Sequence, residues 1–376
     1  MEEWKEYKLG DILNFRRGHD LPHSKMKDGN IPVAGSNGII GYHNEATPVS
    51  PCITIGRSGN VGTPYIYKQC WAHNTVLYVD DFKQNDPLYL YYLLKTLPLS
   101  SFGGGSAVPT LNRNHIHPLI IKHTPNINTQ RQIASILKSL DDKIEVNRRI
   151  NENLEQQAQA LFKSWFVDFE PFKNGEFVES ELGMIPKGWR VGKLGDLVDI
   201  IKPSIKPQGN LVYSHYSIPA FDESQIPSSD IGETIKSNKF SIQDSVTLLS
   251  KLNPEHKRIW YVNKVEANAI CSTEFLPFYA KNREQSAFIY CYLNSSYIYR
   301  EIANGARGTT NSHQRIDAKA ILSRDLAYNN KVISLFCNIV GSILEQRCHA
   351  SQESRRLATL RDTLLPRLMS GELTIQ

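Results

Sequence analysis

The sequence predicts an α+β protein built as a tandem duplication, in which two similar mixed domains are separated by two long helices. Three observations support this fold class: a long segment with a 3.5-residue apolar repeat, a second such segment near the C-terminus, and a short motif that opens both halves. We expect the helices to form an antiparallel coiled coil with pseudo-two-fold symmetry. The predicted parts are a first domain (1–128), a first spacer helix (129–170), a connector with a second domain (171–330) and a second spacer helix (331–376).

The first spacer helix is predicted from Thr129 to Phe166, a segment without internal proline or glycine. Alternating steps of four and three residues define a seam, which contains Ile133, Leu137, Leu140, Ile144, Asn147, Asn151, Leu154, Ala158, Leu161 and Trp165. A repeat of this length predicts a coiled-coil helix about 57 Å long. The two asparagines weaken the packing but help to specify register and partner. The alternative is a long core helix of one large domain.

The second spacer helix repeats the first at an offset of 203 residues. Corresponding positions include Ile133 and Phe336, Leu137 and Val340, and Trp165 and Leu368. Because each helix carries the apolar stripe that the other must bury, we predict that they pair within one chain, which brings the N- and C-termini close together. Pro366 is expected to kink or loosen the last turns. Asp141-Asp142-Lys143 is interpreted as a solvated charge cluster on the surface of the first helix.

Short strand-like runs broken by Gly, Pro and Asn fill the first domain, with one good helix at 87–97. The domain opens with Trp4 and the motif Lys8-Leu9-Gly10-Asp11. The same residues return as Trp189 and Lys193-Leu194-Gly195-Asp196, at an offset of 185. The later runs follow in the same order, and the run 286–298 takes the place of the first domain's helix. The repetition therefore covers the whole chain.

Composition narrows the function classes. A chain of 376 residues with 40% hydrophobic content suggests two or three domains with substantial cores. No run of 18 apolar residues predicts a membrane span, and the charged N-terminus lacks an apolar signal core, which favours a cytoplasmic location. The six cysteines form no CxxC pair, so no zinc site is predicted. The net charge of +5 permits nucleic-acid binding without requiring it.

Four sequence features occur together in this chain: the repeated motif Trp-x3-Lys-Leu-Gly-Asp, QRQIASIL at 130–137, LFKSWFVDFEPF at 161–172 and LLPRLMSGEL at 364–373. In this combination the full chain resembles the specificity (S) subunits of type I restriction–modification systems. The resemblance implies a non-catalytic subunit with two target-recognition domains, each reading one half of a bipartite site on double-stranded DNA. It also implies that the helix pair acts as a ruler and docks two methyltransferase subunits.

The same resemblance implies that restriction subunits join the assembly. S-adenosylmethionine, ATP and Mg are expected only on the partner subunits, and no cofactor is expected on this chain. The sequence agrees, since it contains neither a GxxxxGK[ST] phosphate loop nor the Asn/Asp-Pro-Pro-Tyr/Phe motif of amino-methyltransferases. We predict no catalytic or metal-binding residues. The alternatives are a protein–protein scaffold with a coiled-coil spacer and a stand-alone restriction or methylation enzyme.

Loops that carry polar side chains beside glycine are the predicted DNA contacts, because arginine pairs with guanine, asparagine or glutamine with adenine, and lysine, serine or threonine with phosphate. The candidates in the first domain are Ser36, Asn37, Arg57, Ser58, Asn60, Asn112, Arg113, Asn114 and His115. The candidates in the second domain are Lys251, Asn253, Lys257, Arg258, Arg307, Thr309, Thr310, Asn311, His313, Gln314 and Arg315. Each residue alone is more often a surface turn or cap residue. The correspondence between the halves favours the loops as groups.

Overall fold

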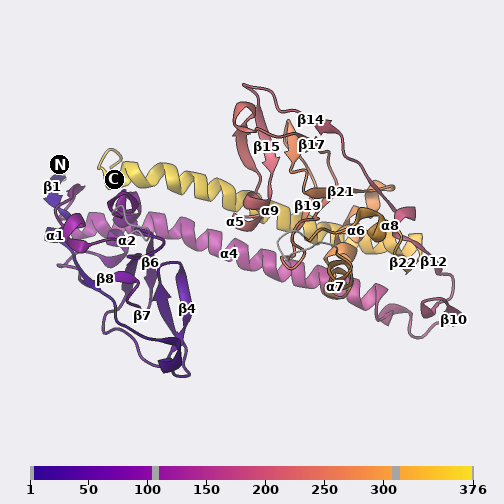
Figure 1. The fold of residues 1–376 in the computed structure, drawn as a ribbon, viewed down its shortest axis with the longest axis horizontal. Coiled ribbons are helices and arrows are strands. Elements are labelled where there is room, and N and C mark those ends of the chain that lie inside the picture. Colours follow the sequence, from indigo (N-terminus) through magenta and orange to yellow (C-terminus); the bar gives the residue numbers. More distant parts are fainter. Residues whose placement is uncertain (1–3, 104–109, 307–313, 375–376) are drawn as a thin grey trace. The chain divides into compact units, whose positions relative to one another are not determined.

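A computed structural model describes residues 4–103, 110–306 and 314–374 (Figure 1). The chain divides into two compact units, one formed by Met1–Lys143 with Leu357–Gln376 and the other by Ile144–Arg356. Both long helices change unit along their length. In the part of the chain that the structure describes, no helix is long and apolar enough to cross a membrane.

The described residues of unit 1 form three small sheets, with strand orders β2-β8-β5-β6, β4-β3-β7 and β1-β9. The strands are β1 (Lys5–Lys8), β2 (Asn14–Arg17), β3 (Ile31–Gly35), β4 (Gly38–His43), β5 (Cys52–Gly56), β6 (Pro64–Tyr67), β7 (Trp71–Ala72), β8 (Val76–Asp81) and β9 (Ile120–His123). The helices are α1 (Leu9–Ile12), η1 (His23–Lys25), α2 (Pro87–Thr96), η2 (Leu99–Phe102), α3 (Arg113–Ile116) and the start of α4 (Ile127–Phe166).

The core of unit 1 joins the domain to both long helices. Phe15 of β2 and Tyr89 of α2 lie in one buried cluster with Leu137 of α4 and Leu368 of α9 (Asn330–Met369). α2 begins at a proline, and the carboxylate of Asp86 accepts a hydrogen bond from the amide of Tyr89 (2.9 Å), which caps the helix. Through this shared core the domain packs directly against both long helices.

Unit 2 contains sheets with strand orders β13-β21-β18-β19, β14-β17-β20-β15-β16, β12-β22 and β10-β11. The strands are β10 (Phe177–Ser180), β11 (Gly183–Pro186), β12 (Arg190–Lys193), β13 (Val198–Ile200), β14 (Ser204–Ile205), β15 (Val212–Tyr216), β16 (Ser228–Ile231), β17 (Lys239–Ser241), β18 (Val246–Ser250), β19 (Ile259–Val262), β20 (Ala269–Cys271), β21 (Phe275–Ala280) and β22 (Asp325–Tyr328). The helices are η3 (Glu170–Phe172), η4 (Leu194–Asp196), α5 (Ile218–Glu223), η5 (Gly232–Thr234), η6 (Arg283–Gln285), α6 (Ser286–Asn294), α7 (Ser296–Asn304) and α8 (Ala318–Leu322).

The strand pairings confirm the predicted duplication. The order β2-β8-β5-β6 corresponds to β13-β21-β18-β19, and the pair β1-β9 corresponds to β12-β22. The parallel pair β3 and β7 likewise matches β15 and β20. Unit 2 differs by the helix α5, which follows β15, and by the extra strands β14 and β17. The helix predicted at 286–298 is instead two helices, because the chain is extended at Ser295 between α6 and α7.

The long helices α4 and α9 each contain 40 residues and run antiparallel (Figure 1). In unit 2, Asn147 donates a hydrogen bond to Glu353 (2.7 Å), and Asn151 donates one to Ser351 (3.0 Å). Residue numbers thus fall on α9 as they rise on α4. Both seam asparagines have partners on the other helix, as expected for residues that specify register. α9 continues through Pro366 and ends at Met369, so a kink or loosening of its last turns stays a prediction.

Each unit also contains a group of charged and phenolic side chains that connects the domain to both helices. In unit 1, the carboxylate of Asp141 on α4 accepts hydrogen bonds from Tyr92 of α2 (2.7 Å) and Arg361 of α9 (2.6 Å). The interpretation of Asp141 as part of a solvated cluster is therefore wrong. Its partners are distant in sequence and become neighbours only when the helices pair.

The matching group in unit 2 is centred on Glu155 of α4. Its carboxylate accepts a hydrogen bond from Tyr290 of α6 (2.5 Å), and Arg347 of α9 lies 3.3 Å from it. Arg347 also donates to the Tyr290 oxygen (2.9 Å) and to Gln225 (3.1 Å). Burial raises the pKa of the Tyr290 phenol well above its ordinary value, so this group remains a hydrogen-bond donor to the carboxylate at physiological pH.

The N-terminal and C-terminal segments meet in unit 1, as predicted (Figure 1). Gly371 follows α9 with φ +72°, and a side-chain carbon there would lie 2.7 Å from the ring of Trp4. Glycine is required on both counts, because it accepts the left-handed conformation and leaves room for the indole.

Candidate DNA interface

Three loops of the first domain meet at Arg57, directly after β5. The Arg57 amide donates to the carbonyl of Thr75 (2.8 Å), and the Leu111 amide donates to the carbonyl of Arg57 (2.7 Å). Ser58 and Thr110 form an isolated antiparallel bridge beside these bonds. The structure therefore brings together the predicted loops around residues 57–60 and 112–115.

The second domain has the same backbone arrangement at Lys251, directly after β18. The Lys251 amide donates to the carbonyl of Glu274 (2.9 Å), and the Ile316 amide donates to the carbonyl of Lys251 (2.9 Å). Leu252 and Arg315 form the matching bridge. Arg57 is thus equivalent to Lys251, Thr75 to Glu274, and Thr110 to Arg315. We refer to this arrangement as the loop junction of each domain.

The turn between β3 and β4 joins the loop junction of the first domain. The Ser36 hydroxyl is buried and lies within hydrogen-bond distance of the carbonyls of Ser58 (2.5 Å) and Thr75 (2.8 Å), while Asn37 beside it is exposed. Glycine is required at position 56, because a side-chain carbon there would lie 1.8 Å from the carbonyl oxygen of Asn60. Ser36 therefore holds the loops together.

The two candidate arginines of the first domain donate to backbone carbonyls. Arg57 Nη1 donates to the carbonyl of Asn74 (3.4 Å), and Arg113 Nη1 donates to that of Phe15 (3.0 Å). Burial and the neighbouring Arg17 lower the pKa of the Arg57 guanidinium, which still leaves it charged at neutral pH.

The remaining candidates of the first domain lie at the surface. The side chain of Asn112 caps α3 by accepting a hydrogen bond from the Asn114 amide (3.0 Å). The side chains of Asn60, Asn114 and His115 are exposed.

Three candidate cations of the second domain, Lys251, Arg258 and Arg315, lie against carboxylates instead. Arg315 donates through Nε (3.3 Å) and Nη2 (3.2 Å) to the two oxygens of Glu274, and Lys251 Nζ lies 3.9 Å from the same carboxylate. Arg258 forms a second two-point pair with Asp222 (2.6 and 2.8 Å), whose hydrogen bonds raise the pKa of the guanidinium. The Arg258 side chain is only 14% exposed, and Asp222 accepts hydrogen bonds from two of its N–H groups.

The other candidates of the second domain are divided between the junction and residues outside the described ranges. Asn253 has φ +51°, and its amide donates to the carbonyl of Gln314 (3.1 Å), so both lie at the loop junction. Lys257 donates to the carbonyl of Asn294 and lies over the ring of Tyr299. Five candidates lie outside the described residues: Arg307, Thr309, Thr310, Asn311 and His313.

Sequence reasoning missed the acidic partners, Glu274 and Asp222. The signal for Glu274 was available, because the β20–β21 segment aligns with the β7–β8 segment and places Glu274 opposite Thr75. The signal for Asp222 was not, because Asp222 lies in α5, which has no counterpart in the first domain.

Comparisons with known proteins identify the family of this chain. A model described as the type I restriction modification DNA specificity domain matches residues 1–156. The type I restriction enzyme MjaIX specificity subunit of Methanocaldococcus jannaschii is 33% identical over 307 residues, which cover 77% of this chain and 69% of that relative. This chain belongs to the type I restriction–modification specificity subunits. It is therefore a non-catalytic subunit that recognises DNA sequence, as the resemblance implied.

Two further comparisons extend over almost the whole specificity subunit. The type I restriction enzyme HindI specificity subunit of Haemophilus influenzae is 25% identical and covers 99% of this chain and 100% of that relative. The crystal structure of the type I restriction–modification S subunit from M. genitalium aligns with a TM-score of 0.63 at 16% identity, covering 98% of this chain and 96% of that one. The latter likeness extends the shared fold to both repeats.

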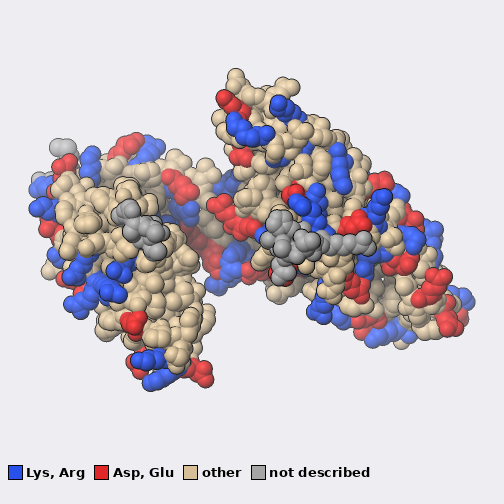
Figure 2. All heavy atoms as spheres, in the orientation of Figure 1, with Lys and Arg blue, Asp and Glu red and all other residues tan. Residues whose placement is uncertain are grey.

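The surface charge of the specificity subunit does not by itself mark a DNA-binding face. On the face shown in Figure 2, Lys and Arg are interspersed with Asp and Glu over both units. The loop junctions, rather than one large positive field, therefore indicate the candidate interface.

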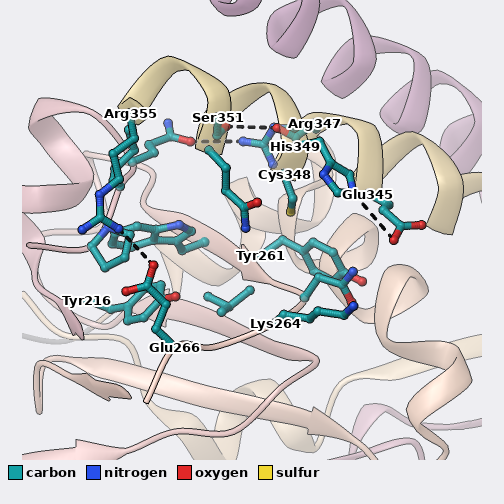
Figure 3. Close-up of a pocket in the computed structure, with 17 residues that line it drawn as sticks. Tyr216, Tyr261, Lys264, Glu266, Glu345, Arg347, Cys348, His349, Ser351 and Arg355 are labelled. Atoms are coloured by element: carbon teal, nitrogen blue, oxygen red, sulfur yellow. Dashed lines mark hydrogen bonds and ion pairs between the residues drawn. The ribbon is translucent and has the colours of Figure 1, made fainter. Parts of the chain in front are cut away.

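A cavity of about 300 Å³ in unit 2 lies apart from the loop junction (Figure 3). Tyr216 and Tyr261 line it on the domain side, and Arg347 and Arg355 line it on α9. Arg355 forms an ion pair with Glu266 across it (3.2 Å). None of the predicted DNA contacts that the structure describes lines this cavity, which marks the joint between the domain and its helix.

Proposed function

We propose that each domain of this specificity subunit reads one half of a bipartite DNA site through its loop junction. The observation that carries the proposal is the repeated set of backbone hydrogen bonds at Arg57 and Lys251, on which different side chains stand. Two equivalent platforms with different polar groups suit a target whose halves differ in sequence. Base edges are read by side chains, and the backbone fixes where those side chains stand.

The helix pair would set the distance between the two half-sites. A helix of 40 residues is about 60 Å long at 1.5 Å per residue, which exceeds one turn of B-DNA at about 34–36 Å. The buried groups around Asp141 and Glu155 support this role, because they attach each domain to both helices and limit its rotation on them.

The same helices would dock two methyltransferase subunits, and restriction subunits would join that complex. In this proposal S-adenosylmethionine, ATP and Mg are bound by the partner subunits, and the complex acts in the cytoplasm. This chain would contribute the DNA sequence and the spacing, and no chemical step.

Methylation mapping of the whole genome tests the proposal in a host that expresses this chain with its cognate methyltransferase subunit. The expected result is a split motif with two defined halves and a constant gap, and no methylation without the partner. Methylation at a continuous motif would contradict the bipartite reading. A stable complex without methylation would favour the scaffold alternative.

A further inference from the structure

The loop junction of the second domain contains a carboxylate between two cations. Glu274 accepts two hydrogen bonds from Arg315 and lies 3.9 Å from the Lys251 ammonium. The side chains remain partly open to solvent: 27% of Glu274 and 49% of Arg315 are exposed. An acidic group at a face that meets DNA phosphates is unfavourable unless it has a function there.

Backbone hydrogen bonds fix both members of the Glu274–Arg315 pair. The Glu274 carbonyl accepts from Lys251, and the Glu274 amide donates to the Ser272 hydroxyl (3.2 Å). Arg315 is held by its bridge to Leu252. These bonds fix the backbone at Glu274 and Arg315, and the hydrogen bonds between the two side chains then fix the direction of the guanidinium.

The geometry of the pair leaves one edge of the guanidinium available. Nε and one Nη2 hydrogen face the two oxygens of Glu274, which accounts for two of the five N–H groups. Within the described residues, Nη1 has no hydrogen-bond partner. Nη1 and the second Nη2 hydrogen form the other two-point edge, which matches the O6 and N7 acceptors of guanine in the major groove.

We propose that Glu274 is a positioning residue that holds Arg315 for reading one guanine in the half-site of the second domain. This inference rests on the proposed function, since it assumes that the loop junction faces DNA. The first domain has no equivalent ion pair at its loop junction, because Thr75 and Thr110 occupy the positions of Glu274 and Arg315. The Glu274–Arg315 pair therefore provides a guanine contact in one half-site and not in the other.

The test uses the complete methyltransferase complex and maps its methylation motif with Glu274→Ala. We expect discrimination at one G·C pair of one half-site to fall about 10- to 100-fold, the range of one lost two-point base contact. Binding to unrelated DNA should become tighter, because a negative charge has been removed beside the phosphates. A purely structural residue would weaken binding to every sequence when replaced.

Two further variants complete the experiment. Arg315→Lys keeps the charge but lacks the fork, so it should lose discrimination at the same G·C pair as Glu274→Ala. Glu266→Ala breaks a comparable ion pair with Arg355 away from the loop junction, and should leave the motif unchanged.

The outcomes separate this inference from the proposed function. If the wild-type motif is not bipartite, the proposed function fails and the inference fails with it. If the wild-type motif is bipartite and Glu274→Ala leaves every position unchanged, the inference alone is overturned. Equal loss at both half-sites would also overturn it, because that result marks a structural role.

Discussion

The two domains share a backbone arrangement but hold their cations differently. In the first domain, Arg57 at the junction donates to a carbonyl, whereas in the second domain Lys251 and Arg315 lie against the carboxylate of Glu274. The backbone bonds at Arg57 and Lys251 are independent of side-chain identity. The same backbone hydrogen bonds can therefore carry different side chains at the candidate DNA interface, because they are formed by amide and carbonyl groups that do not depend on the side chain.

The same comparison applies where each domain meets the helices. Both units place a tyrosine hydroxyl, a carboxylate of α4 and an arginine of α9 together, but the group in unit 2 is larger. Arg347 has three side-chain partners, namely Glu155, Tyr290 and Gln225, whereas Arg361 has Asp141 and the neighbouring Asp362. We therefore expect unit 2 to depend more on its arginine.

The largest effect should come from Arg347→Met. Its loss leaves the largely buried carboxylate of Glu155 without its ion-pair partner, and we expect the free energy of unfolding of unit 2 to fall by about 2–4 kcal/mol. The matched variant, Arg361→Met in unit 1, should cost less. Hydrogen exchange of the amides in each unit measures both, and an equal loss would refute the asymmetry.

The junction cations should differ in how they affect DNA binding. Arg57→Ala should weaken recognition of one half-site by about 1–3 kcal/mol if a two-point base contact is lost. Lys251→Ala should instead weaken binding evenly across sequences and lower the salt slope by about 1, because an ammonium acts as a point charge. Binding isotherms at several salt concentrations, on DNA with either half-site altered, distinguish the two.

Acid should destabilise unit 1 through the buried His123. His123 is 2% exposed, and burial lowers its pKa from 6.5 to about 4. The unfolded chain therefore binds a proton that the folded chain does not, and stability is lost as pH falls from 6.5 towards 4. At pH 5.5 we expect a loss of about 1.4 kcal/mol.

The control for this pH effect comes from unit 2. Lys5 pairs with His123 across β1 and β9, and Arg190 pairs with the buried Tyr328 across β12 and β22, so Tyr328 is the equivalent residue. His123→Phe should therefore reduce the acid sensitivity of unit 1 between pH 6.5 and 5, with the remainder coming from His73 and His117, whose pKa values burial also lowers. Persistence of the full slope in that variant would assign it to other groups.

The smallest expected effect is a difference in stability between two tyrosine variants, one in each unit. Tyr290→Phe removes a hydroxyl that bonds to Glu155, Arg347 and Asn294, whereas Tyr92→Phe removes one bond to Asp141. We expect the cost of the first variant to exceed that of the second by about 1 kcal/mol. Urea unfolding monitored separately in each unit provides the measurement. Equal costs would mean that the extra partners of Tyr290 contribute little.

The helices, the duplication and the positions of the loops follow from the amino-acid sequence alone. The seam from Ile133 to Trp165 is readable because its period follows from helix geometry, and the repeated Trp and Lys-Leu-Gly-Asp motif marks the second copy. The sequence likewise predicts that the second helix extends past Pro366, and its last turns pack in the core of unit 1 through Leu365, Leu368 and Met369.

The partners of the polar groups, in contrast, become visible only in the folded chain. Arg315 and Glu274 are 41 residues apart, and Asp141 and Arg361 are 220 apart, so no local pattern predicts that they meet. Ser36 is similar, because its hydroxyl is directed to carbonyls of two other loops. Periodicity is a property of one segment, whereas the pairing of a charge depends on which segments the fold places side by side.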